Sequence, residues 1–202
     1  GEVIGVNVST AGNELSFLVP VHYLRNLLSE VEKSAGKEVD LTQRITQQLL
    51  ASQQQTMQQL LQAEWKTMKL GNAIVPAELA AYFKCWGQTD NKPDMLYTYT
   101  YSACASPDNI YISDHFETGS IDFRYDLMST DRLNTLQFYN LYTAKFAEGY
   151  STNHADEEDV ANFQCNTRFI DIAGKTWKAA LCFRAYKKFS GLHDVALSMA
   201  SL

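Results

Sequence analysis

The residue types that hydrolytic enzymes use stand side by side at Ser113-Asp114-His115. The members of a catalytic triad converge in space from separate parts of a chain, so three successive positions do not form one. Ser120 follows Gly119 but lacks the glycine two residues later that a nucleophile elbow needs. His22, His154 and His193 have no matching constellation in the sequence. We therefore predict that these residues hold no catalytic group, and we interpret Ser113-Asp114-His115 as a turn.

Metal-binding patterns are also missing from the sequence. The acidic run Asp156-Glu157-Glu158-Asp159 lacks the Asp-x-Asp-x-Asp-Gly pattern of a calcium loop, and we interpret it as a solvated loop. No Cys-x-x-Cys pair occurs, and the four histidines are dispersed, which argues against a zinc site. We expect neither a metal nor a cofactor.

Four cysteines carry more information: Cys85, Cys104, Cys165 and Cys182. Each successive pair flanks a segment rich in turn-forming residues. If each segment is a hairpin, the first pair lies opposite across a turn centred between Asp94 and Met95. The second pair lies opposite across a turn centred between Ala173 and Gly174. Both pairs are then close enough for a disulfide.

Other states of these cysteines stay open at this point. Buried free thiols are the alternative, and four cysteines allow three pairings that sequence alone does not resolve. We favour two local disulfides, which predict an oxidising, extracytoplasmic compartment, either periplasmic or secreted.

Composition excludes two classes of partner. The net charge is −6 and the cations are scattered, which argues against a nucleic-acid partner. No stretch approaches the run of about 18 apolar residues that a membrane-spanning helix needs. With 46% hydrophobic and 20% charged residues, the composition is that of a globular protein. The oligomeric state cannot be predicted.

The chain divides into three segments by pattern. Residues 1–33 predict a strand, a turn, a second strand and a helix. Residues 34–71 predict a linker and one long glutamine-rich amphipathic helix, which runs from about Val39 to Leu70, is capped by Asp40 with Gln43 and stops at Gly71-Asn72. Its apolar stripe either packs within the chain, which we favour, or pairs with another copy in a coiled coil.

Residues 72–202 predict an antiparallel β-rich accessory domain ending in a helix over 192–202. Tyr97, Tyr99 and Tyr101 alternate with small polar residues, so their rings share one face of a strand. That face is either packed or a binding platform for peptide or sugar. Residues 136–146 suit a strand or a short helix equally. The fold class we predict is α+β, and we find no internal repeat in the sequence.

Two linked motifs near the start carry a resemblance to a known family. Gly1-Glu2-Val3-Ile4-Gly5-Val6-Asn7 is followed by Ser16-Phe17-Leu18-Val19-Pro20-Val21 and an apolar helix-like segment. Over residues 1–28 this resembles the C-terminal strands of trypsin-like serine peptidases of the HtrA/Deg type. The remainder of the chain resembles no family we can name, and it lacks the glycine-rich signature of the PDZ domains that often follow such peptidases.

The resemblance implies a function for the parent protein. In that family the nucleophile, base and orienting aspartate precede the Gly1-Glu2 strand, so the catalytic triad lies upstream and is absent here. The chain also starts within a strand-like sequence, without an initiator methionine, which predicts a C-terminal fragment. We expect an extracytoplasmic serine endopeptidase that acts by acyl transfer, needs no cofactor, and takes a peptide or protein substrate. The 202-residue chain alone should be inactive.

The resemblance also implies substrate-binding positions. Val8, Ser9 and Thr10 match the strand edge that pairs with an extended substrate. Phe17, Leu18 and Val19 match the strand that walls the primary specificity pocket. The alternative is a non-enzymatic, disulfide-stapled β domain that acts as a peptide-binding, protein-binding or structural module.

Overall fold

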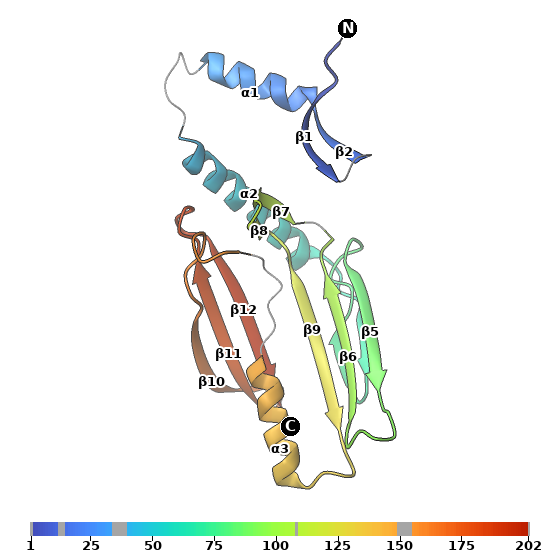
Figure 1. Cartoon of the computed structure of the whole chain (residues 1–202). Coiled ribbons are helices and arrows are strands. Elements are labelled where there is room, and N and C mark those ends of the chain that lie inside the picture. Colours follow the sequence, from blue (N-terminus) through green and yellow to red (C-terminus); the bar gives the residue numbers. More distant parts are fainter. Residues whose placement is uncertain (1, 12–14, 34–39, 108, 149–154, 202) are drawn as a thin grey trace. The chain divides into compact units, whose positions relative to one another are not determined.

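The structure is a computed structural model that describes residues 2–11, 15–33, 40–107, 109–148 and 155–201. The chain forms two compact units, Gly1–Arg44 and Ile45–Leu202 (Figure 1). Antiparallel β-sheets dominate, with 43% of the described residues in strands and 27% in helices. The predicted α+β fold class with one long helix is therefore wrong.

The first unit contains β1 (Gly5–Ala11), β2 (Leu15–Pro20) and α1 (Val21–Lys33), which confirms the predicted strands and helix. The two strands pair antiparallel, with a register shift between Asn7 and Ser9 that leaves Val8 as a β-bulge. Gly5 lies opposite Pro20, and a Cβ at Gly5 would lie 2.8 Å from the carbonyl oxygen of Val19. The hairpin therefore closes tightly only because glycine stands there.

Helix α2 (Leu41–Gln62) is shorter than predicted. It begins at the predicted cap, where the N–H of Gln43 donates to Asp40 Oδ1 at 3.0 Å. It ends before residue 71 because the indole N–H of Trp65 donates to the carbonyl of Leu60 at 2.8 Å, satisfying one of the last carbonyls of the helix. The predicted stop, Gly71-Asn72, instead forms the turn between β3 (Thr67–Leu70) and β4 (Ala73–Pro76).

The second unit has one sheet in the order β5-β6-β9. Its strands are β5 (Lys84–Asp90), β6 (Thr98–Ala105) and β9 (Asp122–Ser129). A short hairpin of β7 (Ile110–Ser113) and β8 (Phe116–Thr118) precedes β9. Asp114 and His115 form its turn, which confirms that interpretation of the Ser-Asp-His run.

The other sheet has the order β10-β11-β12, from β10 (Gln164–Ile172), β11 (Lys175–Ala185) and β12 (His193–Ala200). The predicted helix over residues 192–202 is wrong. Leu192, Val195 and Met199 fit a helical spacing, but residues 193–200 also fit a period of two, and pairing with β11 selects the strand.

Helix α3 (Thr135–Glu148) resolves the segment that suited either a strand or a helix. A reciprocal capping box fixes its start. The N–H of Gln137 donates to Asn134 Oδ1 at 3.0 Å, and the N–H of Asn134 donates to Gln137 Oε1 at 3.1 Å.

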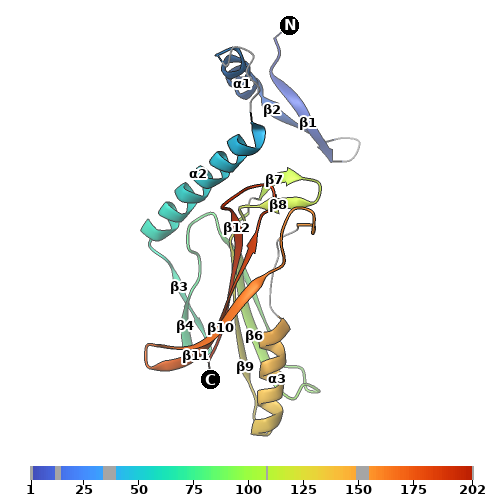
Figure 2. The same cartoon turned by 90° about the vertical axis from the view of Figure 1, so that its left-hand side faces the viewer.

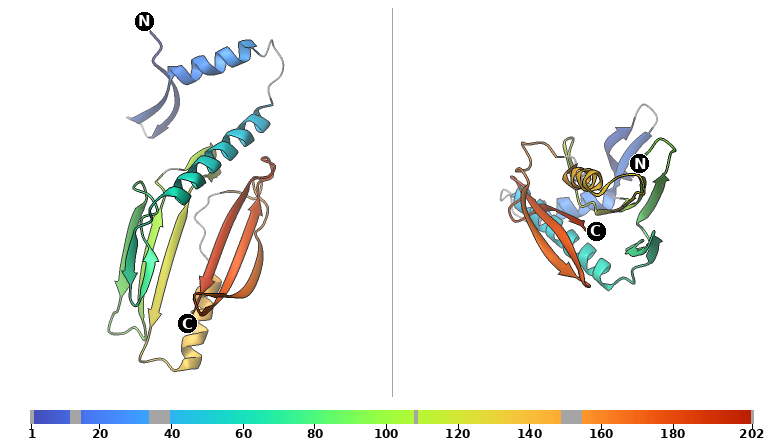
Figure 3. Two further views of the ribbon diagram at one scale, coloured as in Figure 1. Left: turned by 180° about the vertical axis from the view of Figure 1, so that it is seen from behind. Right: turned by 90° about the horizontal axis from the view of Figure 1, so that it is seen from below.

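The second unit repeats one arrangement, although the sequence shows no repeat. In each half a helix, α2 or α3, comes before a three-stranded antiparallel sheet, and a disulfide joins the first two strands of that sheet. The first half differs by two added hairpins, β3–β4 before its sheet and β7–β8 before β9. Cys104 lies opposite Phe123 on the third strand of one half, and Cys182 lies opposite Ala196 on that of the other. Helices α2 and α3 lie on opposite sides of the strands (Figures 2 and 3).

Two apolar clusters hold α2, one in its first half through Leu49 and one near its C-terminal end through Leu60. Leu49 packs with Phe116, Tyr186 and neighbouring side chains, whereas Leu60 packs with Phe83 and Cys104. The segment of α2 between these two clusters borders a cavity, which is described below.

Candidate functional site

A cavity of about 530 Å³ lies within the second unit. Residues 118–124 and 126 border it on the β9 side, and residues 192–199 border it on the β12 side. Its size lies within the range of about 300–1,000 Å³ that is typical of ligand sites. It is the candidate site of this unit because it combines this size with apolar and polar lining side chains.

Helix α2 forms another wall of the cavity. Leu49, Ser52, Gln53, Thr56 and Met57 line it, and this spacing of three and four residues places them on one helix face. Because Leu49 and Leu60 anchor the helix, its central side chains are held against the cavity. The wall combines three polar side chains, Ser52, Gln53 and Thr56, with two apolar ones, Leu49 and Met57.

The last strand of each half faces the cavity. In Figures 1 and 3 the two sheets lie beside each other, with β9 and β12 as the adjoining strands. Among the described strands, β9 pairs only with β6 and β12 pairs only with β11. Consecutive residues of β12 line the cavity, so it is the edge of this strand that borders it, not one face.

A buried hydrogen-bond network stiffens one end of β12. Asp194 is 6% exposed and accepts from Arg184 Nε at 2.9 Å and Arg184 Nη2 at 2.5 Å. Tyr186 Oη donates to the other Asp194 oxygen at 2.5 Å, and Thr118 Oγ1 lies 2.5 Å from Tyr186 Oη. Burial first, and then the hydrogen bond to Asp194, raise the pKa of Tyr186. Asp194 thus joins β11 to β12 through buried hydrogen bonds.

A second cluster on the β9 side involves the tyrosine row. Arg124 lies with its guanidinium carbon 4.3 Å from the ring centroid of Tyr101. Arg124 also donates to Asp126 at 2.8 Å and to Tyr99 Oη at 2.5 Å. Burial and the hydrogen bond to Asp126 raise the pKa of Tyr99 to about 12. The rings of Tyr99 and Tyr101 are half-buried under Arg124, which favours a packed face over an open binding platform.

Four charged side chains that line the cavity, Arg124, Asp126, Lys145 and Asp194, are paired within the protein. Besides the two clusters, Lys145 donates to Glu148 at 3.0 and 2.8 Å. The apolar lining includes Phe123, Phe146 and Phe163. The site therefore favours uncharged ligand groups over a free anion or cation.

Both predicted disulfides are confirmed. Cys85 joins Cys104 with a Cα–Cα distance of 4.1 Å, and Cys165 joins Cys182 at 4.0 Å. In each case the two cysteines are directly opposite across a hairpin, as the turn positions predicted. The second turn has positive φ at Ala173 (51°) and Gly174 (76°).

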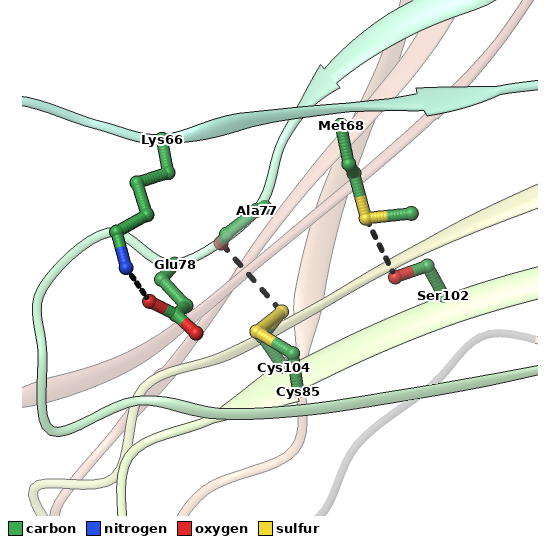
Figure 4. The surroundings of a disulfide bond; sticks show 7 residues. All are labelled: Lys66, Met68, Ala77, Glu78, Cys85, Ser102 and Cys104. Atoms are coloured by element: carbon green, nitrogen blue, oxygen red, sulfur yellow. Dashed lines mark hydrogen bonds and ion pairs between the residues drawn. A yellow bond between two sulfur atoms is a disulfide. The ribbon is translucent and has the colours of Figure 1, made fainter.

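Figure 4 shows how the first bridge is covered. Cys104 Sγ lies 3.6 Å from the carbonyl oxygen of Ala77, a contact without a proton because the sulfur is oxidised. Ser102 Oγ donates to Met68 Sδ at 3.4 Å, and Lys66 pairs with Glu78. The β3–β4 hairpin thus packs over this bridge.

The predicted substrate-binding residues lie together on the hairpin of the first unit. Val8 is the bulge residue, Ser9 lies opposite Phe17, and Thr10 lies opposite Ser16. Val19, next to Leu18, lies opposite Val6. Their binding role stays a prediction.

The histidine and acidic residues considered in the sequence make other contacts in the structure. His115 Nδ1 lies 3.8 Å from Asp156 on the surface, and Tyr111 Oη donates to Asp114 at 2.5 Å. In the acidic run, Asp159 is buried, and its Oδ1 lies 2.9 Å from Lys188 Nζ. The predicted solvated loop is therefore wrong for this residue. Among the described residues no group of three or more histidine, cysteine or acidic side chains is placed to hold a metal ion. His154 lies outside the described residues.

Sequence reasoning missed the cavity because the cavity is formed by two strand edges and a helix from distant parts of the chain.

No protein-family model, curated protein or solved structure matches this sequence. None of the helices in the described residues is long and apolar enough to cross a membrane.

Proposed function

We propose that the first unit is the closing hairpin and helix of a trypsin-like serine peptidase domain. The whole chain is then the C-terminal part of an extracytoplasmic serine endopeptidase whose catalytic triad precedes Gly1. The observation that carries this proposal is the uncovered apolar surface of the first unit. Val8 is 59% exposed, Leu18 is 52% exposed, and no residue of α1 is buried.

A hairpin and one helix, with no buried side chain among those the structure describes there, do not make a stable domain of their own. The apolar residues of β1, β2 and α1 need more protein to pack against, and the body of a β-barrel peptidase would supply it. The motifs Gly1–Asn7 and Ser16–Val21 support the same assignment.

The proposed chemistry is acyl transfer from a peptide or protein substrate to a serine, with hydrolysis of the acyl-enzyme. In this scheme the backbone of Val8, Ser9 and Thr10 pairs with the extended substrate. Phe17, Leu18 and Val19 wall the primary specificity pocket. The bulge at Val8 is consistent with this role, because bulges re-aim side chains beside active sites. No cofactor takes part.

The two disulfides support an extracytoplasmic location, since such bonds persist in oxidising compartments such as the periplasm. We propose in addition that the protein is either periplasmic or secreted.

The coding sequence that precedes Gly1 tests the peptidase assignment. We expect a histidine, then an aspartate, then a Gly-Asn-Ser-Gly-Gly-Pro motif shortly before Gly1. A start codon or an unrelated domain at that place would contradict the proposal. In parallel, the purified 202-residue chain should hydrolyse no peptide substrate.

The cavity favours a second function for the other unit, that of a disulfide-stapled module that binds peptide or protein. This unit has its own apolar clusters and a ligand-sized cavity with mixed lining. Equilibrium binding of peptides to the 202-residue chain tests this second proposal separately from peptidase activity.

A further inference from the structure

We propose that the edge of β12 that pairs with no described strand binds an extended polypeptide segment, which lies in the cavity as an added β-strand. This inference rests on the proposal that the second unit is a binding module. It does not depend on the peptidase assignment.

The hydrogen-bond direction along β12 follows from one observed contact. The N–H of Tyr186 donates to the carbonyl of Leu192 at 3.0 Å, so residue 192 turns its backbone toward β11. In an antiparallel pair, hydrogen-bonded and non-hydrogen-bonded residues alternate. Residues 194, 196 and 198 therefore bond to β11, opposite residues 184, 182 and 180.

The intervening residues turn their backbone groups the other way. These are His193, Val195, Leu197 and Met199, and all four line the cavity. Among the described residues, no backbone hydrogen bond outside the sheets reaches their N–H groups. The cavity thus meets a row of four N–H and four C=O groups at the spacing of a β-strand, which is the template that strand addition uses.

The second disulfide gives an independent check on this direction. Cys165 and Cys182 lie only 4.0 Å apart at their Cα atoms, as in a non-hydrogen-bonded pair of β10 and β11. Cys182 must then turn its backbone toward Ala196 on β12. This agrees with the direction set by Tyr186 and Leu192.

The side chains that line the cavity indicate which kind of polypeptide segment binds there. The charges of Asp194, Arg124 and Lys145 are paired within the protein, so a charged ligand gains no counter-ion there. Val195 and Leu197 are 61% and 60% exposed and offer apolar contacts along the edge. A segment of uncharged residues with alternating small polar and aliphatic side chains fits this chemistry.

The test uses the 202-residue chain and a blocked decapeptide in which serine alternates with valine. Its matched control is the same peptide with every second backbone nitrogen methylated, which cannot pair as a strand. Amide exchange followed by NMR should slow at residues 193, 195, 197 and 199 when the unmodified peptide binds. Exchange at residues 194, 196 and 198 should stay unchanged, because these amides already bond to β11.

Two variants of one residue separate backbone pairing from side-chain contact. Val195→Pro removes an outward N–H at an edge position, where proline is tolerated, and should weaken binding at least about tenfold. Val195→Ala keeps the N–H and should weaken binding less than about threefold. Unfolding midpoints and intact disulfides check that both variants fold. If Val195→Pro does not fold, the exchange pattern of the unaltered chain decides alone.

The outcomes separate this inference from the module proposal. Binding of both peptides alike, without alternating protection, overturns strand addition and leaves a binding module of another kind. Absence of binding up to about 1 mM peptide overturns both. A dimer in sedimentation that Val195→Pro dissociates also overturns the inference, because the occupant is then a second copy of the chain.

Discussion

The hydroxyl of Tyr186 donates to Asp194 at 2.5 Å, while Arg184 holds the other oxygen of the same carboxylate at 2.5 and 2.9 Å. This joins the end of β11 to the start of β12 through buried groups. The cavity wall formed by β12 depends on this contact, because it fixes the strand at the point where residues 192–199 begin to line the cavity.

Asp194→Ala should lower the free energy of unfolding by about 3 kcal/mol or more, because it leaves the nearly buried guanidinium of Arg184 unpaired. Urea denaturation measures this change. The matched control is Asp156→Ala, which removes an exposed carboxylate beside His115 and should cost less than about 1 kcal/mol. Equal effects of the two substitutions would show that the network does not hold β12.

Stability should fall at alkaline pH partly through Tyr186. Its pKa is raised above the ordinary value of 10.0, by burial first and then by the hydrogen bond to Asp194. Above pH 10.0 the unfolded chain releases a proton that the folded protein keeps. The stabilisation is therefore complete below pH 10.0 and is lost as the pH rises toward the folded pKa.

Urea midpoints measured from neutral to alkaline pH test this linkage. Tyr186→Phe should flatten the alkaline decline, and it should also lower stability by about 1–2 kcal/mol at neutral pH through the lost hydrogen bonds. Tyr99, whose pKa is raised to about 12, should ionise late in an absorbance titration. Identical alkaline declines of the unaltered chain and Tyr186→Phe would contradict the assigned environment.

The two disulfides should differ in their rate of reduction. In the first bridge Cys85 is exposed, but Cys104 is 1% exposed and covered by the β3–β4 hairpin. In the second bridge Cys165 is exposed on the edge strand β10 and Cys182 is partly exposed, so neither cysteine is buried. A thiolate must reach a sulfur to reduce it, so the Cys165–Cys182 bridge should open first under mild reductant. Timed alkylation and peptide mass analysis measure the order. Removing either bridge should cost about 3 kcal/mol. Reduction of Cys85–Cys104 first would contradict the described packing.

Parts of the fold were accessible from sequence because local rules decide them. Hairpin registers follow from cross-strand pairing, so the positions of the four cysteines placed both turns. The cap of α2 at Asp40 was also readable, because a side-chain acceptor three residues before a free N–H is a local signal.

Other parts depend on long-range pairing that local patterns do not record. Residues 193–200 carry both a helical and an alternating spacing, and only β11 decides between them. The start of α3 did have a signal, the Asn134–Gln137 capping box, which the strand-like alternation of Leu136 to Phe146 obscured. The cavity needs β9, β12 and α2 to meet, so no segment predicts it alone.

Substitution of Leu18 tests whether a peptidase domain covers the apolar surface of the first unit. In the 202-residue chain this side chain is half-exposed, so Leu18→Asp should change little there. In the intact gene product it should be buried, and the same change should cost at least about 3 kcal/mol. Leu61→Asp, at a residue 79% exposed on α2, is the control and should be mild in both. A mild effect of Leu18→Asp in both proteins would mean that no barrel packs on β2.

The most direct measurement of the peptidase assignment is covalent labelling of the intact gene product with a fluorophosphonate, followed by mass mapping of the labelled residue. The proposal predicts one labelled serine, located before Gly1, and loss of labelling when that serine is replaced by alanine. No labelling of the folded intact protein, or labelling of a serine within residues 1–202, would contradict it.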